Sequence, residues 1–208
     1  MDIKTFKQHG LDQAWDDLHA QSHKVNGRSN AEILEVLDTA GDAHYHPCAE
    51  AYVRDGVVPG EVWSFKNWDQ SSVFINTRRD IRVYKSSGVD TAKSLKLMVF
   101  NDGTGYLGRN GAVRATTVLD NLIHAGEWAP TLAVFINPGL PPNVEAPAPG
   151  QRPDSLAQRQ RSVEYDSCDE RYLRLLVDEI VPFVTRELEV QVSDDPADRT
   201  ICGLSLIH

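Results

Sequence analysis

The chain has 208 residues, of which 41% are hydrophobic and 25% charged, a composition typical of a globular protein. Its formal net charge at pH 7 is −9, from 30 acidic and 21 basic residues. We therefore expect no binding to nucleic acid or to an anionic membrane surface, because both need clustered basic side chains. No apolar run reaches the ~20 residues of a membrane helix, and the N-terminus lacks the apolar segment of a secretion signal. Together these features predict a cytoplasmic protein.

The first 58 residues indicate a short, mostly helical N-terminal extension. Residues 3–18 and 31–37 carry apolar side chains at roughly helical spacing, and Asn30 is a suitable N-cap for the second segment. Residues 56–60 contain two glycines and a proline, which is typical of a linker. We therefore expect the main domain to comprise residues 59–208.

Three residues of types that bind metals lie close together in the last part of this extension. His44, His46 and Cys48 lie within five residues, and zinc could recruit His19 and His23 as further ligands. A structural zinc site usually takes four ligands in paired spacings, however, and no second cluster of Cys or His is close in sequence. The three cysteines of the chain are odd in number and widely spaced, so no disulfide framework is expected. We expect no metal and no cofactor.

From residue 61 onward, short runs rich in β-branched and aromatic residues predict strands. The expected strands are residues 62–65, 72–75, 80–84, 95–100, 131–136 and 199–202. Two of them, 95–100 and 131–136, are more continuously apolar, as in strands buried on both faces of a parallel sheet. Residues 112–124 between these two place apolar side chains on one helical face, which predicts a β–α–β unit.

The second half of the chain contains a long loop and the strongest helix prediction. Residues 140–153 are rich in proline and cannot hold regular structure for long. Residues 169–188 then carry a clear apolar helical face, with Ser167 or Asp169 as the cap. Pro182 should kink this helix or divide it, since proline lacks the backbone N–H that a helix interior needs.

The first segment that carries chemistry is at the end of the chain, where strand 199–202 leads into Gly203, Leu204 and Ser205. A strand followed by Gly-x-Ser is the first half of the nucleophile elbow, Gly-x-Ser-x-Gly. Small neighbours allow a strained turn that exposes the serine Oγ beside amides able to stabilise an oxyanion. Here Leu206 follows instead of a small residue and the second glycine. Alone, Gly-x-Ser is explained at least as well by a strand that ends in an ordinary turn.

The second segment, residues 101–106, follows strand 95–100 directly and contains Asp102, Gly103, Thr104 and Tyr106. A glycine-bearing turn at the carboxyl end of an inner strand is where α/β sheets form their ligand crevice. In α/β-hydrolases this loop supplies one backbone N–H of the oxyanion hole. An ordinary Asp-Gly turn is equally compatible, whereas dinucleotide binding would need a third glycine. The order and separation of the two segments fit one fold, and so each strengthens the other.

Several stretches resemble the enterochelin-esterase-like family of esterases in the α/β-hydrolase superfamily. The likeness runs from about Gly60 to Ser205, and its densest parts are residues 97–106, 120–123, 135–139, 161–167, 171–172 and 195–199. The resemblance implies an α/β fold, with a partial α/β-hydrolase sheet that runs through the nucleophile strand. It also implies a Ser–acid–His triad. By position Ser205 would be the nucleophile, and the backbone N–H groups of Thr104 and Leu206 would form the oxyanion hole.

The same resemblance places a set of side chains on the substrate side: Asp102, Gly103, Tyr106, Arg161 and Glu164. For Arg161 and Glu164 a structural ion pair or hydrogen-bond network is an equal alternative. The substrate would be a small-molecule carboxylic ester, whose identity the sequence does not specify.

Family members continue beyond the serine with the triad acid and histidine, whereas here Leu206, Ile207 and His208 follow. This departure predicts a chain truncated at the nucleophile elbow, inactive toward p-nitrophenyl acetate, and self-associating through an uncovered sheet edge. His208 is too close to the serine in sequence to replace the base, and His124 should face solvent or cap its helix. The alternative is a non-catalytic remnant that binds a small molecule or a protein, which a monomeric, cooperatively unfolding chain would favour.

Overall fold

The computed structural model describes residues 24–25, 28–29, 48–90, 93–109, 113–147 and 153–203. The chain divides into two compact units, Met1–Cys48 and Ala49–His208. In the first unit β1 (Lys24–Val25) pairs antiparallel with β2 (Arg28–Ser29). The helices expected at residues 3–18 and 31–37, and the His44–His46 pair, lie outside the described residues.

The second unit is built on a five-stranded sheet with the strand order β3-β4-β6-β5-β7. Its strands are β3 (Glu61–Trp68), β4 (Arg79–Lys85), β5 (Lys96–Asn101), β6 (Thr131–Ile136) and β7 (Arg199–Cys202). β5 is parallel to both β6 and β7, whereas β3 and β4 form an antiparallel pair that joins β6. All six residues of β6 are buried, as the apolar run predicted. Five of the expected strands are therefore confirmed.

The strand expected at residues 72–75 is wrong, because this segment is an irregular turn. The carboxylate of Glu179 accepts hydrogen bonds from the backbone N–H groups of Ser72 at 2.7 Å and Val73 at 3.2 Å, and from the Ser72 hydroxyl at 2.6 Å. A side chain thus takes the donors that a neighbouring strand would use. Phe74, which is 5% exposed, anchors the turn in the core.

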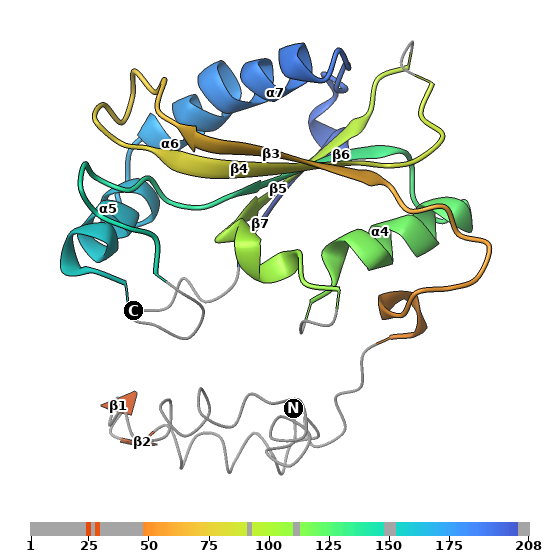
Figure 1. Cartoon of the computed structure of the whole chain (residues 1–208), viewed down its shortest axis with the longest axis horizontal. Helices are drawn as coiled ribbons and strands as arrows, with labels where there is room; N and C mark the ends of the chain where they lie inside the picture. The colour runs from red at the N-terminus through yellow and green to blue at the C-terminus, as the bar shows by residue number, and fades with distance from the viewer. Residues whose placement is uncertain are drawn as a thin grey trace. The chain divides into compact units, whose positions relative to one another are not determined.

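Helices cover the two faces of this sheet (Figure 1). One face packs against α4 (Ala115–His124), with Leu119 against Phe100 and Phe135. The other face packs against a run of three helical segments: α6 (Arg171–Arg174), the π-helical turn η4 (Leu175–Ile180) and α7 (Val181–Glu187). No helix in the described part of the chain is both long enough and apolar enough to span a membrane.

The helix expected at residues 169–188 is confirmed, and its division falls just before Pro182. Proline has no N–H to give to the carbonyl four residues earlier, and the wider π-helical turn that precedes α7 accommodates that missing bond. The N-cap position is Glu170 and not Ser167 or Asp169, but the Asp169 carboxylate accepts the N–H of Arg171, the first residue of α6, at 2.9 Å.

One helix, α5 (Ser155–Tyr165), was not expected from the sequence. Asp154 is its N-cap and accepts the Leu156 N–H at 2.8 Å. The helix buries only Ala157 and Glu164, so it lacks the apolar stripe on which helix prediction relies.

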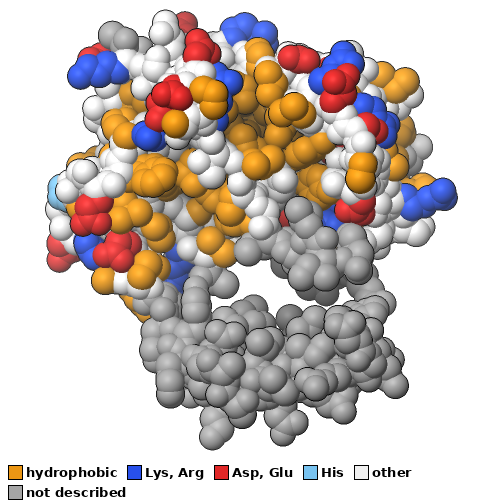
Figure 2. Space-filling view, turned by 180° about the vertical axis from the view of Figure 1, so that it is seen from behind, with side chains coloured by type: hydrophobic (Ala, Val, Ile, Leu, Met, Phe, Trp, Pro, Cys, Tyr) orange, Lys and Arg blue, Asp and Glu red, His pale blue; other side chains and the backbone are white. Residues whose placement is uncertain are grey.

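Some apolar side chains remain on the surface. Leu173, Val177 and Ile201 expose 61%, 48% and 57% of their areas. Figure 2 shows several patches of hydrophobic side chains on the side of the molecule turned away in Figure 1. Ile201 belongs to β7, which lies at one edge of the described sheet.

Candidate active site

The candidate site lies where β5, β6 and β7 end. Parallel strands finish at the same edge of a sheet, and the register pairs Phe100 with Cys202 and Asn101 with Ile136. The segments that follow these strands therefore leave the sheet side by side: the turn after Asn101, the turn after Ile136, and the chain after Cys202. Ser205 and Leu206, the expected nucleophile and second oxyanion donor, lie outside the described residues.

The turn after β5 is tightly packed against β6. It continues from Asp102, whose φ of 52° is left-handed, into the short 3₁₀ helix η3 (Gly103–Tyr106). A Cβ atom at Gly103 would come within 2.5 Å of the Phe135 Cα atom, so only glycine fits there. Thr104 and Gly105 are exposed, so the middle of the turn faces outward.

Tyr106 anchors the far end of this turn and is only 3% exposed. Its ring packs against Phe100 at a centroid distance of 4.9 Å, and the Cys202 thiol lies 3.9 Å from its hydroxyl oxygen. Burial, followed by the hydrogen bond with Cys202, raises the pKa of Tyr106 to about 12. The tyrosine expected to contact substrate thus connects the turn to β7.

The backbone N–H of Thr104, the expected oxyanion donor, donates to the side-chain oxygen of Asn137 at 3.2 Å. In return the Asn137 amide donates to the Thr104 hydroxyl at 2.8 Å. Asn137 directly follows β6, and sequence reasoning gave it no role. Its position after the strand next to β5 is the signal that could have identified it.

Side chains of α5 hold Asp102 in place. The Arg161 guanidinium bonds both carboxylate oxygens, with Nη2 to Oδ2 at 2.8 Å and Nε to Oδ1 at 3.4 Å. The backbone N–H of Asp102 donates to the Tyr165 hydroxyl at 3.2 Å. The hydrogen bond that Arg161 donates to Asp102 raises the pKa of Arg161, and burial raises the pKa of Tyr165. Arg161 therefore contacts the turn itself.

Aromatic contacts extend this arrangement to the last residue of β5. The rings of Tyr165 and Tyr172 meet edge to face at 5.1 Å, and the Tyr172 hydroxyl donates to the side-chain oxygen of Asn101 at 2.6 Å. The guanidinium of Arg161 also lies 5.1 Å from the centre of the Tyr165 ring, within cation–π range. The end of β5 and the start of the turn thus share one polar network with α5 and α6.

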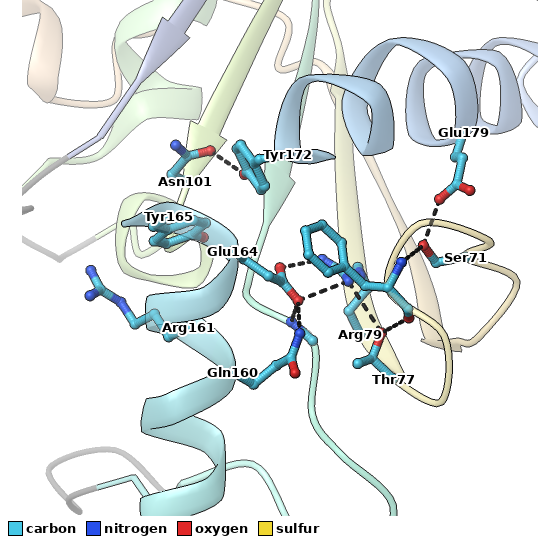
Figure 3. Close-up of polar contacts among 12 residues, drawn as sticks. Ser71, Thr77, Arg79, Asn101, Gln160, Arg161, Glu164, Tyr165, Tyr172 and Glu179 are labelled. Carbon is cyan, nitrogen blue, oxygen red and sulfur yellow. Dashed lines mark hydrogen bonds and ion pairs between the residues drawn. The ribbon is translucent and has the colours of Figure 1, made fainter. Parts of the chain in front are cut away.

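Glu164 lies deeper, in a buried ion pair with Arg79 of β4 (Figure 3). Its oxygens accept from Arg79 at 2.8 and 3.1 Å, and Oε1 also accepts from the Gly139 N–H at 3.0 Å and from Gln160 at 2.9 Å. The side chains of Arg79 and Glu164 are 1% and 0% exposed. For Glu164 these contacts support the structural alternative, since the carboxylate fixes α5 and the turn after β6.

His124 lies at the other end of the sheet. It is exposed at the end of α4, where it lines a cavity of about 330 Å³ together with Tyr84 and Ser86. Ser86 bonds Thr131, the first residue of β6, so this cavity is at the edge where the parallel strands begin. The solvent-facing position predicted for His124 is confirmed. Among the described residues, no group of three or more His, Cys, Asp or Glu side chains could hold a metal ion.

Comparisons with known proteins identify the fold of the chain. No family model matches the chain, and no curated protein sequence matches it significantly. Solved structures do match. One is the CE1 ferulic acid esterase of Anaeromyces mucronatus in the absence of substrate, with 15% identity and a TM-score of 0.54 over 77% of this chain and 55% of that one. The chain therefore shares part of the α/β fold of this esterase, in agreement with the partial α/β-hydrolase sheet that the sequence predicted.

A second similar structure is that of an esterase named for a different substrate. The chain is similar to the enterobactin esterase FES of Shigella flexneri, with 18% identity and a TM-score of 0.52 over 77% of this chain and 34% of that one. The chain thus spans about half of the ferulic acid esterase and a third of the enterobactin esterase. At these identities the likeness shows the fold alone.

Proposed function

We propose that the chain carries the nucleophile and the oxyanion turn of a serine-dependent carboxylic ester hydrolase, with Ser205 as the nucleophile. The observation that carries this proposal is the parallel pairing of β7 with β5, in which Cys202 is paired with Phe100. Ser205 follows Cys202 by three residues, which span at most about 10 Å. That reach keeps the serine close to the edge from which the Asp102 turn projects.

The oxyanion hole would consist of the backbone N–H groups of Thr104 and Leu206. The Thr104 N–H already holds an acceptor oxygen, that of Asn137, and an ester carbonyl oxygen is an acceptor of the same kind. In the reaction the serine Oγ gives its proton to a base and attacks the ester carbon, and the two N–H groups stabilise the resulting oxyanion. The ester C–O bond then breaks, and the alcohol departs with that proton. Water hydrolyses the acyl-enzyme that remains.

A full catalytic cycle also needs a base that reaches the serine and an acid that orients the base. His124, the single histidine of the described ranges, lies at the opposite edge of the sheet. We propose that none of the histidines of the chain serves as this base, and we then expect no serine-dependent turnover of p-nitrophenyl acetate by the purified chain. Serine-dependent hydrolysis that Ser205→Ala abolishes would contradict this part of the proposal.

The nucleophile and oxyanion turn can be tested without a histidine. A thiol is nucleophilic without a neighbouring base, because a few per cent of it is ionised at neutral pH. The Ser205→Cys variant is treated with p-nitrophenyl acetate, and the acetylation rate of each cysteine is measured by peptide mass spectrometry. The exposed Cys48 and Cys168 serve as internal references.

We expect the thiol at position 205 to be acetylated at least about tenfold faster than the references, since one oxyanion donor is worth ~10²–10³ in rate. Each rate is divided by the thiolate fraction obtained from its pH dependence. Equal or slower acetylation at position 205 would contradict the proposed function.

A further inference from the structure

Helix α5 presents three side chains on one face toward the end of the sheet. Arg161, Glu164 and Tyr165 are spaced i, i+3 and i+4, so they project from the same side of the helix. Glu164 is the deepest of them, and its ion pair with Arg79 ties the helix to β4. Arg161 and Tyr165 are thereby held within hydrogen-bonding distance of Asp102.

These two side chains contact the same residue through different groups. Arg161 donates to the carboxylate of Asp102, and the Tyr165 hydroxyl oxygen accepts the backbone N–H of Asp102. A side chain that bonds the backbone fixes the direction of the peptide group, while the ion pair fixes the side-chain rotamer. Asp102 needs both constraints, because its φ of 52° is a left-handed conformation that L-residues seldom adopt.

The setting makes these contacts stronger than an ordinary surface ion pair. The Arg161 side chain is 17% exposed and that of Asp102 36%, so the guanidinium is largely removed from water. Tyr165 lies beneath the guanidinium and is itself fixed by the Tyr172 ring. Solvent screening, which reduces exposed pairs to near zero, is therefore limited here.

We propose that Arg161 and Tyr165 are positioning residues for the oxyanion turn. By holding Asp102 in its left-handed conformation they direct the following amides, above all that of Thr104, over the ends of β5 and β7. This inference rests on the proposed function, since the direction of the Thr104 N–H matters for catalysis only if an oxyanion forms there. The conformational part can be measured independently of any reaction.

The conformational test is amide hydrogen exchange measured by NMR on the 208-residue chain. Arg161→Met removes the charge but keeps most of the aliphatic stem, and Tyr165→Phe keeps the ring but removes the oxygen that accepts the Asp102 N–H. Arg159→Met is the matched control, because Arg159 is exposed on the same helix. We expect the Thr104 and Gly105 amides to exchange about tenfold faster in both test variants, as the loss of one hydrogen bond to Asp102 would predict.

Two further measurements separate positioning from general stability. The urea midpoint should fall more in Arg161→Met than in Arg159→Met, because a partly buried ion pair is lost, but the extra exchange should be confined to the Thr104 and Gly105 amides. Arg161→Lys should restore part of the Thr104 protection, because it keeps the charge but not the forked geometry. Unchanged exchange at Thr104 in Arg161→Met would overturn the inference. So would an equal loss of protection throughout β5 and α4, which would indicate a merely structural role.

The catalytic part is tested in the Ser205→Cys background. Adding Arg161→Met should reduce acetylation at position 205 by about tenfold and leave the Cys168 reference unchanged. If the turn amides respond as expected but the thiol at position 205 never exceeds the reference, the proposed function fails while the conformational role of Arg161 stands. If the thiol is fast and Arg161→Met does not slow it, the positioning role fails alone.

Discussion

Glu164→Gln removes one charge from the buried Arg79–Glu164 pair with little change in shape. Arg79, whose side chain is 1% exposed, would keep its charge without a counter-ion. Breaking a buried pair in this way costs ~3–5 kcal/mol. The glutamine oxygen can still accept the Gly139 N–H, so we expect about 3 kcal/mol, at the lower end of that range. This is a large fraction of the ~5–15 kcal/mol that stabilises a typical domain.

Removing both charges should be less harmful than removing one. The double variant Arg79→Met with Glu164→Leu leaves no buried charge, and its main cost is the Gly139 N–H without an acceptor, about 1–3 kcal/mol. The free energy of unfolding is obtained from urea titrations followed by circular dichroism. Glu170→Gln is the control, since Glu170 and Arg174 form an exposed pair 3.8 Å apart.

The control should show no measurable shift. If Glu164→Gln behaved like the control, the pair would not be buried as described. If the double variant were less stable than Glu164→Gln, the uncompensated charge could not be the main cost.

Three further predictions concern the site and the edge of the sheet. Gly103→Ala should destabilise the chain by about 1–3 kcal/mol in thermal unfolding, because its Cβ would meet Phe135, whereas Gly105→Ala has free space and should be tolerated. Tyr106 should ionise near pH 12 in an absorbance titration. Because its pKa is raised above the usual 10, its contribution to stability is full below pH 10 and is lost as pH rises toward 12. Finally, we propose self-association through the β7 edge, where Ile201→Lys should shift sedimentation toward the monomer; an unchanged distribution would contradict it.

The strands that form the centre of the fold could be predicted because their composition reflects their burial. β5 and β6 are mostly apolar; all six residues of β6 and four of the six residues of β5 are buried. The segment at residues 72–75 has the same composition, yet Glu179, more than 100 residues away in sequence, takes its backbone donors. Local pattern carries no information about such a partner.

Helix α5 is the reverse case, an element that forms although the sequence pattern did not predict it. One of its two buried residues is Glu164, whose charge is balanced inside the protein by Arg79, 85 positions earlier. A pattern that treats charge as a sign of exposure assigns this face to solvent. The helix could still have been suggested by the Asp154 cap and the absence of proline and glycine from residues 155–165.

The candidate site was predictable in its backbone and not in its side-chain partners. A glycine-containing turn directly after a buried strand identified Asp102 and Gly103, since few other sequences allow the chain to turn so closely against β6. The partners of that turn, Arg161 and Asn137, come from other elements: the sequence placed Arg161 on the substrate side but did not pair it with Asp102, and it gave Asn137 no role. Residues that approach through tertiary contact leave no spacing signal in one sequence.

The central claim is that the residue at position 205 lies against the Asp102 turn. Its most direct test is thiol cross-linking with dibromobimane in a chain whose three native cysteines are replaced. The pair Thr104→Cys with Ser205→Cys should form the fluorescent bridge, because β7 is paired with β5. The matched pair His124→Cys with Ser205→Cys should not, because His124 lies at the opposite edge. Equal bridging of both pairs, or of neither, would contradict the account.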